Sequence, residues 1–244
     1  IPIFSKLKTR KIPNKIKFLY ITPLRALNRD IFKRIINYAE NEELKIEIRH
    51  GDTSQANRKR ITDNPPDILI TTPETLVNLL SQKKHLDSLS DLEWIIVDEL
   101  HELLASERGS QLSLSLERLQ INTKNEIHRI GLSATVGNPD EAGRFLVGSE
   151  RTKPEIIHDK SLRKYDIDVV FVKGAQAGSS KLVDVVFEIN KYIKKQQISS
   201  PVLLFTNSRG ESERLSSILK QKTSRLVELH HGSLSRQVRE ETED

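Results

Sequence analysis

Residues 95–101, Ile95-Ile96-Val97-Asp98-Glu99-Leu100-His101, are the most informative stretch of the chain, because apolar residues are followed at once by two carboxylates. A short apolar run rich in Ile and Val is typical of a strand buried on both faces of a parallel sheet. Such a strand would bring Asp98 and Glu99 to its carboxyl end, where adjacent residues of an extended chain point to different faces. One carboxylate could then hold Mg²⁺ through water while the other polarises an attacking water. A second interpretation is the acidic start of a helix.

Six more apolar runs have the length and composition of a buried strand, and segments with helical spacing separate them. The runs cover residues 18–21, 68–70, 130–132, 169–172, 202–205 and 226–229, and the run before Asp98 begins at Trp94 and covers residues 94–97. Helical spacing is kept by Leu24, Leu27, Ile31 and Ile35, by Leu182, Val186, Ile189 and Ile193, and by Leu215 and Leu219. The alternation of strand and helix predicts an α/β fold in which helices cover both faces of a parallel sheet.

Polar residues stand directly after several of these runs. Thr22-Pro23, Thr71-Thr72-Pro73 and Thr206-Asn207-Ser208 each follow a predicted strand, as Asp98-Glu99 does. Ligands of open α/β sheets bind at the carboxyl ends of the strands, so these residues are candidates for a binding edge. Thr72 followed by Pro73 also has the pattern of a helix N-cap with proline at the first helical position.

The composition excludes some kinds of site and favours a polyanionic partner. The 244 residues include no cysteine, which rules out disulfides and thiolate metal sites. No apolar run approaches the roughly 18 residues that a membrane span needs, so we expect no membrane partner. Because neither a signal-peptide pattern nor cysteine occurs, we predict a cytoplasmic location, and we also expect a monomer. Residues 1–60 carry 15 Lys and Arg against 6 Asp and Glu. Such a basic segment suits nucleic acid, although a solvated lysine-rich surface would look the same.

A weak internal repeat suggests two related halves. In the first half, a predicted strand leads into residues 22–25, and a later strand leads to His50-Gly51. In the second half, a predicted strand leads into residues 206–209, and a later strand leads to His231-Gly232. Polar, turn-like sequence places the boundary between about residues 155 and 165, which predicts one domain over 1–160 and another over 161–244. The alternative is that any two α/β units look alike at this level of detail.

Together, the polar strand ends resemble the motif series of superfamily 2 helicases. Thr22–Leu27, Thr72–Glu74, Asp98–His101 and Ser133–Thr135 have the order and approximate spacing of motifs Ia, Ib, II and III, and Leu204–Arg209 resembles motif IV. By itself, Ser133-Ala134-Thr135 would be read as a turn or helix cap. The longer sequences around these motifs, at residues 20–30, 97–103, 132–139 and 230–236, are similar to those of the Lhr (large helicase-related) family of DExH-type helicases. The Ski2-like group, which would mean an RNA helicase, is the nearest competitor.

The resemblance implies RecA-like (P-loop NTPase type) parallel sheets flanked by helices, with one nearly complete domain and the start of a second. It also implies an ATP-dependent motor that uses ATP and Mg²⁺ and moves along nucleic acid, expected to be DNA, with RNA or a hybrid left open. At the matching positions, Asp98 would hold Mg²⁺ through water and Glu99 would be the general base for ATP hydrolysis. His101, Ser133 and Thr135 would couple the nucleotide site to the strand. The residues that would line the nucleic-acid track are Pro23, Arg25, Gly51, Thr72, Pro73, Asn207, Ser208, Arg209 and Gly232.

Two parts of the family's motor have no counterpart in these residues. No Gly-x-x-x-x-Gly-Lys-Thr phosphate loop occurs; in the family it would precede Ile1, and the arginine-finger motif would follow Asp244. The chain alone is therefore predicted to hydrolyse ATP negligibly. A second hypothesis, an ATP-independent nucleic-acid-binding module of helicase descent, stays open beside the fragment of a motor. An unrelated hydrolase or dehydrogenase is disfavoured, because neither a nucleophile elbow nor a Gly-x-Gly-x-x-Gly motif occurs.

Overall fold

The computed structural model describes residues 2–9, 12–134, 136–148, 153–158, 167–169 and 180–231. The chain divides into two compact units, residues 1–160 and 161–244, and each unit is described by itself. Within the described residues, no helix combines the length and the apolar character that crossing a lipid bilayer requires.

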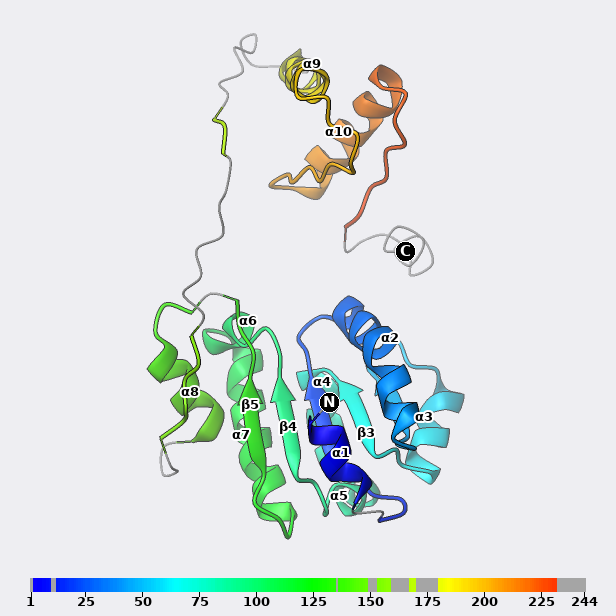
Figure 1. Ribbon diagram of the computed structural model, residues 1–244, viewed down its shortest axis with the longest axis vertical. Helices are drawn as coiled ribbons and strands as arrows, with labels where there is room; N and C mark the ends of the chain where they lie inside the picture. Colours follow the sequence, from blue (N-terminus) through cyan, green and yellow to red (C-terminus); the bar gives the residue numbers. More distant parts are fainter. Residues whose placement is uncertain are drawn as a thin grey trace. The chain divides into compact units, whose positions relative to one another are not determined.

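Unit 1 is built on a five-stranded parallel sheet (Figure 1). Its strands are β1 (Phe18–Ile21), β2 (Ile46–Arg49), β3 (Ile68–Thr71), β4 (Trp94–Val97) and β5 (His128–Gly131), in the spatial order β2-β3-β1-β4-β5. The register aligns the last residues of all five strands: Arg49, Thr71, Ile21, Val97 and Gly131 lie side by side. The residues that follow the strands therefore meet at one edge of the sheet.

Helices cover both faces of this sheet, as the alternation of strand and helix predicted. They are α1 (Pro2–Lys8), α2 (Arg25–Asn41), α3 (Gln55–Asp63), α4 (Pro73–Leu80), α5 (Lys83–Ser88), α6 (His101–Leu104), α7 (Glu107–Asn122) and α8 (Pro139–Val147). Side chains of α1 and α2 form one core with the sheet face that holds Phe18 and Tyr20. Side chains of α4, α7 and α8 form a second core with the face that holds Leu19 and Ile21. Burial on both faces explains why these strands are continuous apolar runs.

Most local predictions for unit 1 are confirmed. β1 and β4 have the predicted bounds, and β3 is one residue longer than its apolar run. β5 begins two residues before the predicted run and ends one residue before its end. β5 lies at an edge of the sheet and is partly exposed along its length. Its residues need not all be apolar, so an apolar run indicates its bounds less clearly than it does for the buried strands. Thr72 caps α4, since its side chain accepts from the Thr75 amide, and Pro73 is at the first helical position.

Unit 2 contains two described helices, α9 (Ser180–Lys195) and α10 (Arg209–Lys222). Both carry the helical spacing that the sequence predicted. They pack against each other through a small core that includes Val186, Leu215 and Leu219.

The predicted strands of unit 2 at residues 202–205 and 226–229 are wrong, because neither segment has strand structure. Leu203, Phe205 and Leu226 are 81%, 91% and 87% exposed. A strand exists only through hydrogen bonds to a neighbouring strand, and the described part of unit 2 offers no such neighbour. Of the predicted strand at 169–172, all but Val169 lies outside the described residues.

Candidate functional site

Asp98 follows β4 directly and has a fixed orientation. Its amide donates to Ile21 O at 2.8 Å, which extends the pairing of β4 with β1 by one residue. Its Oδ1 accepts from the Glu99 amide at 2.9 Å, and its Oδ2 accepts from the Tyr20 hydroxyl at 2.8 Å. Burial, and then the Asp98 carboxylate, raise the pKa of Tyr20, so this hydroxyl keeps its proton and remains a donor. Each oxygen is therefore held by one donor and retains a lone pair for a further ligand.

Glu99 turns the chain sharply after the strand. Its backbone φ is 49°, in the left-handed region that few residues other than glycine adopt. The turn separates the two carboxylates: Asp98 faces Tyr20, while Glu99 Oε2 lies 3.4 Å from His101 Nδ1. An extended chain was expected to produce this separation, but the left-handed turn at Glu99 produces it instead. Because α6 begins at His101, neither carboxylate lies in the first turn of a helix, which argues against the acidic-start interpretation.

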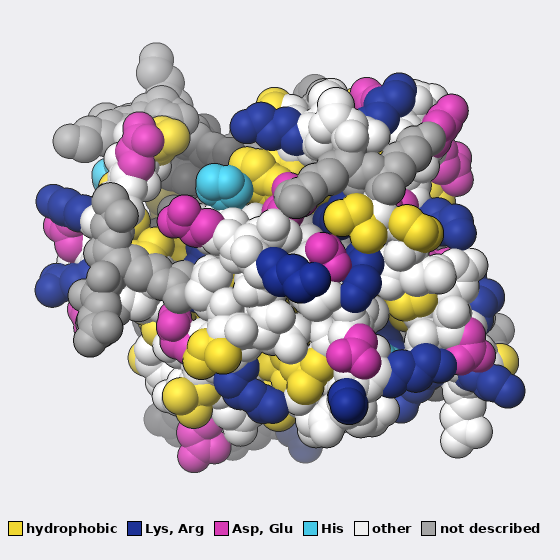
Figure 2. Space-filling model, turned by 90° about the horizontal axis from the view of Figure 1, so that it is seen from below, with side chains coloured by type: hydrophobic (Ala, Val, Ile, Leu, Met, Phe, Trp, Pro, Cys, Tyr) yellow, Lys and Arg dark blue, Asp and Glu magenta, His cyan; other side chains and the backbone are white. Residues whose placement is uncertain are grey.

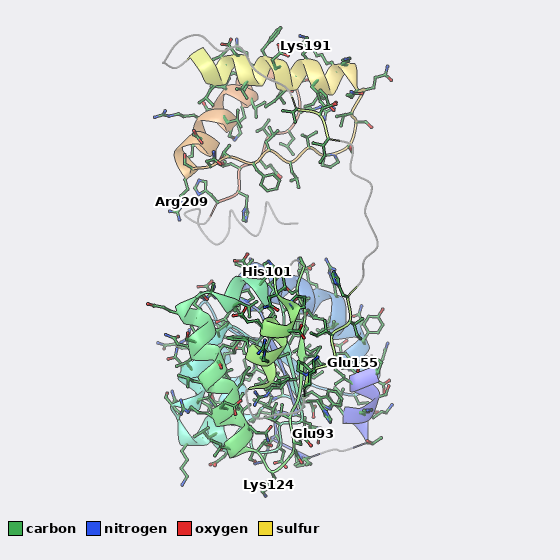
Figure 3. The ribbon with its side chains drawn as sticks, turned by 90° about the vertical axis from the view of Figure 1, so that its left-hand side faces the viewer. Glu93, His101, Lys124, Glu155, Lys191 and Arg209 are labelled. Atoms are coloured by element: carbon green, nitrogen blue, oxygen red, sulfur yellow. The ribbon has the colours of Figure 1, made fainter. Side chains whose placement is uncertain are left out.

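His101 connects the residues after β4 with those after β5. Its Nδ1 lies 3.1 Å from Ser133 Oγ as well as 3.4 Å from Glu99 Oε2. The backbone supports the contact, since the Leu132 amide donates to Val97 O at 2.8 Å and the Leu100 amide to Leu132 O at 2.9 Å. Figure 3 shows His101 at one end of unit 1 and Glu93 and Lys124 at the other. Glu93 directly precedes β4, and Lys124 lies shortly before β5, so His101 is at the carboxyl end of the sheet. Thr135, the third predicted coupling residue, lies outside the described residues.

The predicted nucleic-acid residues of unit 1 lie on the other half of the same edge. Pro23 follows β1, Thr72 and Pro73 follow β3, and Gly51 stands just beyond β2. Because the strand order is β2-β3-β1-β4-β5, the turns that carry these residues are neighbours, and β4 separates them from the end of β5. Arg25 begins α2, next to the turn at Pro23, but its side chain lies outside the described residues.

Arg108 of α7 joins two of these turns. Its Nη2 donates to Pro23 O at 2.8 Å, and its Nε donates to Glu74 Oε1 at 2.5 Å. Burial alone would raise the pKa of Glu74, but bonds from Arg108, from its own backbone amide and from the Thr72 hydroxyl hold this pKa below its ordinary value. One guanidinium thus fixes the turn after β1 relative to the first turn of α4.

The predicted residues of unit 2 gather at the start of α10. Ser208 is the N-cap, and its side chain accepts from the Glu211 amide at 3.2 Å. Thr206 Oγ1 donates to Ser208 O at 3.1 Å, which stabilises the same turn. Asn207 and Arg209 flank the cap and are exposed, and Figure 3 labels Arg209 at the start of α10. The remaining predicted residue, Gly232, lies outside the described residues.

Sequence reasoning assigned no role to Tyr20 and Arg108. A signal for Tyr20 was present, because a tyrosine two residues before Thr22, in a strand of otherwise apolar residues, brings a hydroxyl that must find a partner. For Arg108 the signal was the glycine that follows it. A Cβ at Gly109 would lie 1.9 Å from Leu103 O, so α6 and α7 approach too closely for any other residue, and this approach places Arg108 at the sheet edge.

The chain is similar to known helicases. The family model described as DEAD/DEAH box helicase matches residues 1–142. The ATP-dependent helicase Lhr-Core protein 2 from Thermococcus barophilus is 36% identical over 97% of this chain and 30% of its own length. The structure of the Mycobacterium smegmatis helicase Lhr bound to ssDNA and AMP-PNP has a TM-score of 0.77 at 32% identity and covers 94% of this chain and 32% of that one.

A more distant structure supports the fold alone. The DEAD-box helicase Mss116 bound to ssRNA and UDP-BeF has a TM-score of 0.75 at 20% identity and covers 99% of this chain and 51% of that one. These likenesses confirm the predicted RecA-like fold. The chain spans about 30% of the length of the curated relatives it matches.

Proposed function

Because the chain belongs to the DEAD/DEAH box helicase family, we propose that it forms part of an ATP-driven, Lhr-type motor that moves along single strands of DNA. The observation that carries the proposal is the contact series from Asp98 through Glu99 and His101 to Ser133, on the edge where the turns after β1, β2 and β3 also lie. Such an edge can join nucleotide chemistry to strand binding. The Lhr relatives are named ATP-dependent helicases, and the Mycobacterium structure holds ssDNA and AMP-PNP, which supports both ligands.

Asp98 is the residue proposed to hold Mg²⁺ through water. The described residues contain no group of three or more His, Cys, Asp or Glu side chains that would bind a metal unaided. Mg²⁺ does not need such a group, because it commonly binds through one or two carboxylates together with waters and substrate phosphates. The Asp98 carboxylate fits this mode, since the Glu99 amide and the Tyr20 hydroxyl orient it without using all its lone pairs. When bound, the ion would neutralise charge on the phosphates during transfer.

Glu99 is proposed as the general base that takes a proton from the attacking water. The turn at φ 49° directs its carboxylate away from Asp98, so the two acidic groups serve different ligands. His101 contacts this carboxylate through Nδ1, and Ser133 contacts the same nitrogen. A change in charge at Glu99 would therefore alter how β4 and β5 are joined, and this is the coupling step of the proposal.

The turns after β1, β2 and β3 are proposed to hold the strand through its phosphates. At this edge Gly51 is exposed and α4 begins with its backbone amides, while Pro23 and Thr72 are buried and would shape the turns around them. Such groups bind phosphates without reading bases, which suits a motor that must pass any sequence. The turn at Asn207-Ser208-Arg209 of unit 2 is proposed to bind phosphates in the same manner. A monomeric state and a cytoplasmic location belong to the same proposal.

The test uses the complete protein with two substitutions at neighbouring positions. Glu99→Gln keeps the size of the side chain but cannot accept a proton, so DNA-stimulated turnover should fall by roughly 10²–10⁴-fold while ATP affinity changes little. Asp98→Asn should instead weaken Mg²⁺-dependent nucleotide binding, because it removes charge that faces the metal. Nucleotide affinity and DNA-stimulated ATPase are measured for both. Near-normal turnover by Glu99→Gln would remove the catalytic assignment.

A further inference from the structure

Arg58 of α3 points its guanidinium toward the turn that follows β2. Its Nη2 donates to Gly51 O at 2.6 Å, which anchors the side chain at the carboxyl edge of the sheet. The side chain is part-exposed, whereas its Nε is buried and has no acceptor among the described residues. The turn itself is braced, since the His50 amide donates to Thr53 Oγ1 at 3.0 Å and the Asp52 amide to His50 Nδ1 at 3.1 Å. Arg58 is therefore held in place before any ligand arrives.

In the described part of the chain, two guanidinium groups lie near each other here and neither forms an ion pair with a carboxylate. Arg49, the last residue of β2, donates from Nη1 to Thr62 Oγ1 at 3.2 Å. Burial, and then the nearby charge of Arg58, lower the pKa of Arg49. Among the described residues, no carboxylate forms an ion pair with either group. Like charges that are close and partly desolvated destabilise the protein, and a bound anion would relieve this.

Arg60, two residues further along α3, has the opposite surroundings. Its Nη1 and Nη2 donate to the two carboxylate oxygens of Glu47 at 2.5 and 2.8 Å. This pairing raises the pKa of Arg60, and it neutralises the charge locally. Of the basic run Arg58-Lys59-Arg60, the structure therefore leaves Arg58 unneutralised at the sheet edge and satisfies Arg60 against β2.

Among the described side chains at the opposite end of unit 1, the two signs of charge are mixed. Figure 2, seen from below, shows Lys and Arg side chains interspersed with Asp and Glu on the face that carries the amino ends of the strands. The unbalanced pair of guanidinium groups instead lies beside the turn after β3, where Thr72 and Pro73 begin α4. From this placement we infer that Arg58 binds a backbone phosphate of the nucleic-acid strand next to the turn at Gly51, with Arg49 adding positive potential behind it.

This inference rests on the proposed function, and its test compares two variants of equal charge in the complete protein. Arg58→Ala and Arg60→Ala each remove one positive charge from the same helix, so any general electrostatic effect is the same in both. Affinity for a fluorescently labelled oligo-dT strand is measured by anisotropy between about 50 and 200 mM salt. Over this range the slope of log affinity against log salt reports the number of phosphate contacts. Thermal denaturation checks that both variants fold, and Arg58→Lys serves as a second variant if Arg58→Ala does not.

Arg58→Ala should bind the strand roughly tenfold more weakly, and the logarithmic salt slope should fall by about 0.7, the value for one lost phosphate contact on a single strand. Arg58→Lys, which keeps the charge but loses the fork, should lie between it and the wild type. Arg60→Ala should change affinity by less than about twofold, because its charge is already paired at the surface. The affinity for AMP-PNP without nucleic acid should be the same in all variants.

Equal losses of strand affinity in Arg58→Ala and Arg60→Ala would overturn the inference. A weaker affinity of Arg58→Ala for AMP-PNP, with its strand affinity unchanged, would also overturn it, since the phosphate bound would then belong to the nucleotide. Neither result would affect the motor itself. If the unmodified complete protein neither binds the strand nor hydrolyses ATP in its presence, it is the proposed function that fails.

Discussion

Replacing Arg108 with alanine should destabilise unit 1 and weaken strand binding together. Its Nη2 donates to Pro23 O at 2.8 Å, and such a bond from a charged donor contributes about 1.5 kcal/mol. Its pair with Glu74 contributes at most about 1 kcal/mol, because the two side chains are 38% and 49% exposed and solvent screens them. The free energy of unfolding should therefore fall by about 2 kcal/mol. The turns after β1 and β3 would also lose the side chain that sets their spacing.

Arg118, on the same helix α7, provides a matched control. Its Nη2 donates to Leu80 O, at the end of α4 away from the sheet edge, at 2.8 Å. For a unit of this size each kcal/mol lowers Tm by roughly 2–4 °C, so Arg108→Ala and Arg118→Ala should both melt several degrees lower. Only Arg108→Ala should weaken binding to a single strand, by tenfold or somewhat less, which corresponds to about 1 kcal/mol. Equal losses of strand affinity would refute the positioning role, and an unchanged Tm for Arg108→Ala would refute the contacts.

The pair also predicts a pH dependence whose sign follows from Glu74. Its pKa in the folded protein is held below the ordinary value of 4.5, against the effect of burial, with Arg108 as the main lowering cause. A carboxyl with a depressed folded pKa contributes stability that is present above its unfolded pKa and is lost as the pH falls through the folded value. The difference in Tm between wild type and Arg108→Ala should therefore shrink below about pH 4. The difference for Arg118→Ala should not follow this pattern.

Three further predictions concern His101, Gly109 and the chain by itself. His101→Ala in the complete protein should retain basal ATP hydrolysis but separate fewer strands per ATP hydrolysed, because it removes the contact with Ser133; an unchanged ratio would contradict the coupling role. Gly109→Ala should lower Tm by several degrees, since a Cβ there would lie 1.9 Å from Leu103 O and overpacking typically costs about 1–3 kcal/mol. Gly137→Ala is its control, because nothing lies within 4 Å of a Cβ at that position, and equal effects of the two substitutions would argue against the close approach of α6 and α7. The 244-residue chain alone has no phosphate loop and should show no ATPase above background with saturating single-stranded DNA; clear stimulated turnover would contradict this.

Local pattern was sufficient for the elements of unit 1 and for the grouping of the site. Residues 18–21 and 94–97 were predicted as strands because strands covered on both faces must be apolar throughout, and that property is visible in the sequence. Parallel strands bring their following residues to one edge, so the approach of His101 to Ser133 could be anticipated from their places after two strands. In unit 2 the same kind of pattern failed at 202–205, because an apolar run records hydrophobicity and not the presence of a hydrogen-bonding neighbour.

Local sequence was enough to predict strands of unit 1 that are buried on both faces, the start of α4 at Pro73, and the polar residues that follow the strands, since each depends on neighbours a few positions away. The strand order β2-β3-β1-β4-β5 is visible only in the folded protein, and it places the turns that we propose to bind phosphates on one half of the edge and the two carboxylates on the other. The tertiary structure alone brought together Tyr20 with Asp98, 78 residues apart, and Arg108 with Pro23, 85 residues apart. It also distinguished the unbalanced Arg58 from the paired Arg60. A side chain's hydrogen-bond partner depends on how whole helices pack against the sheet, and no local periodicity in the sequence indicates that packing.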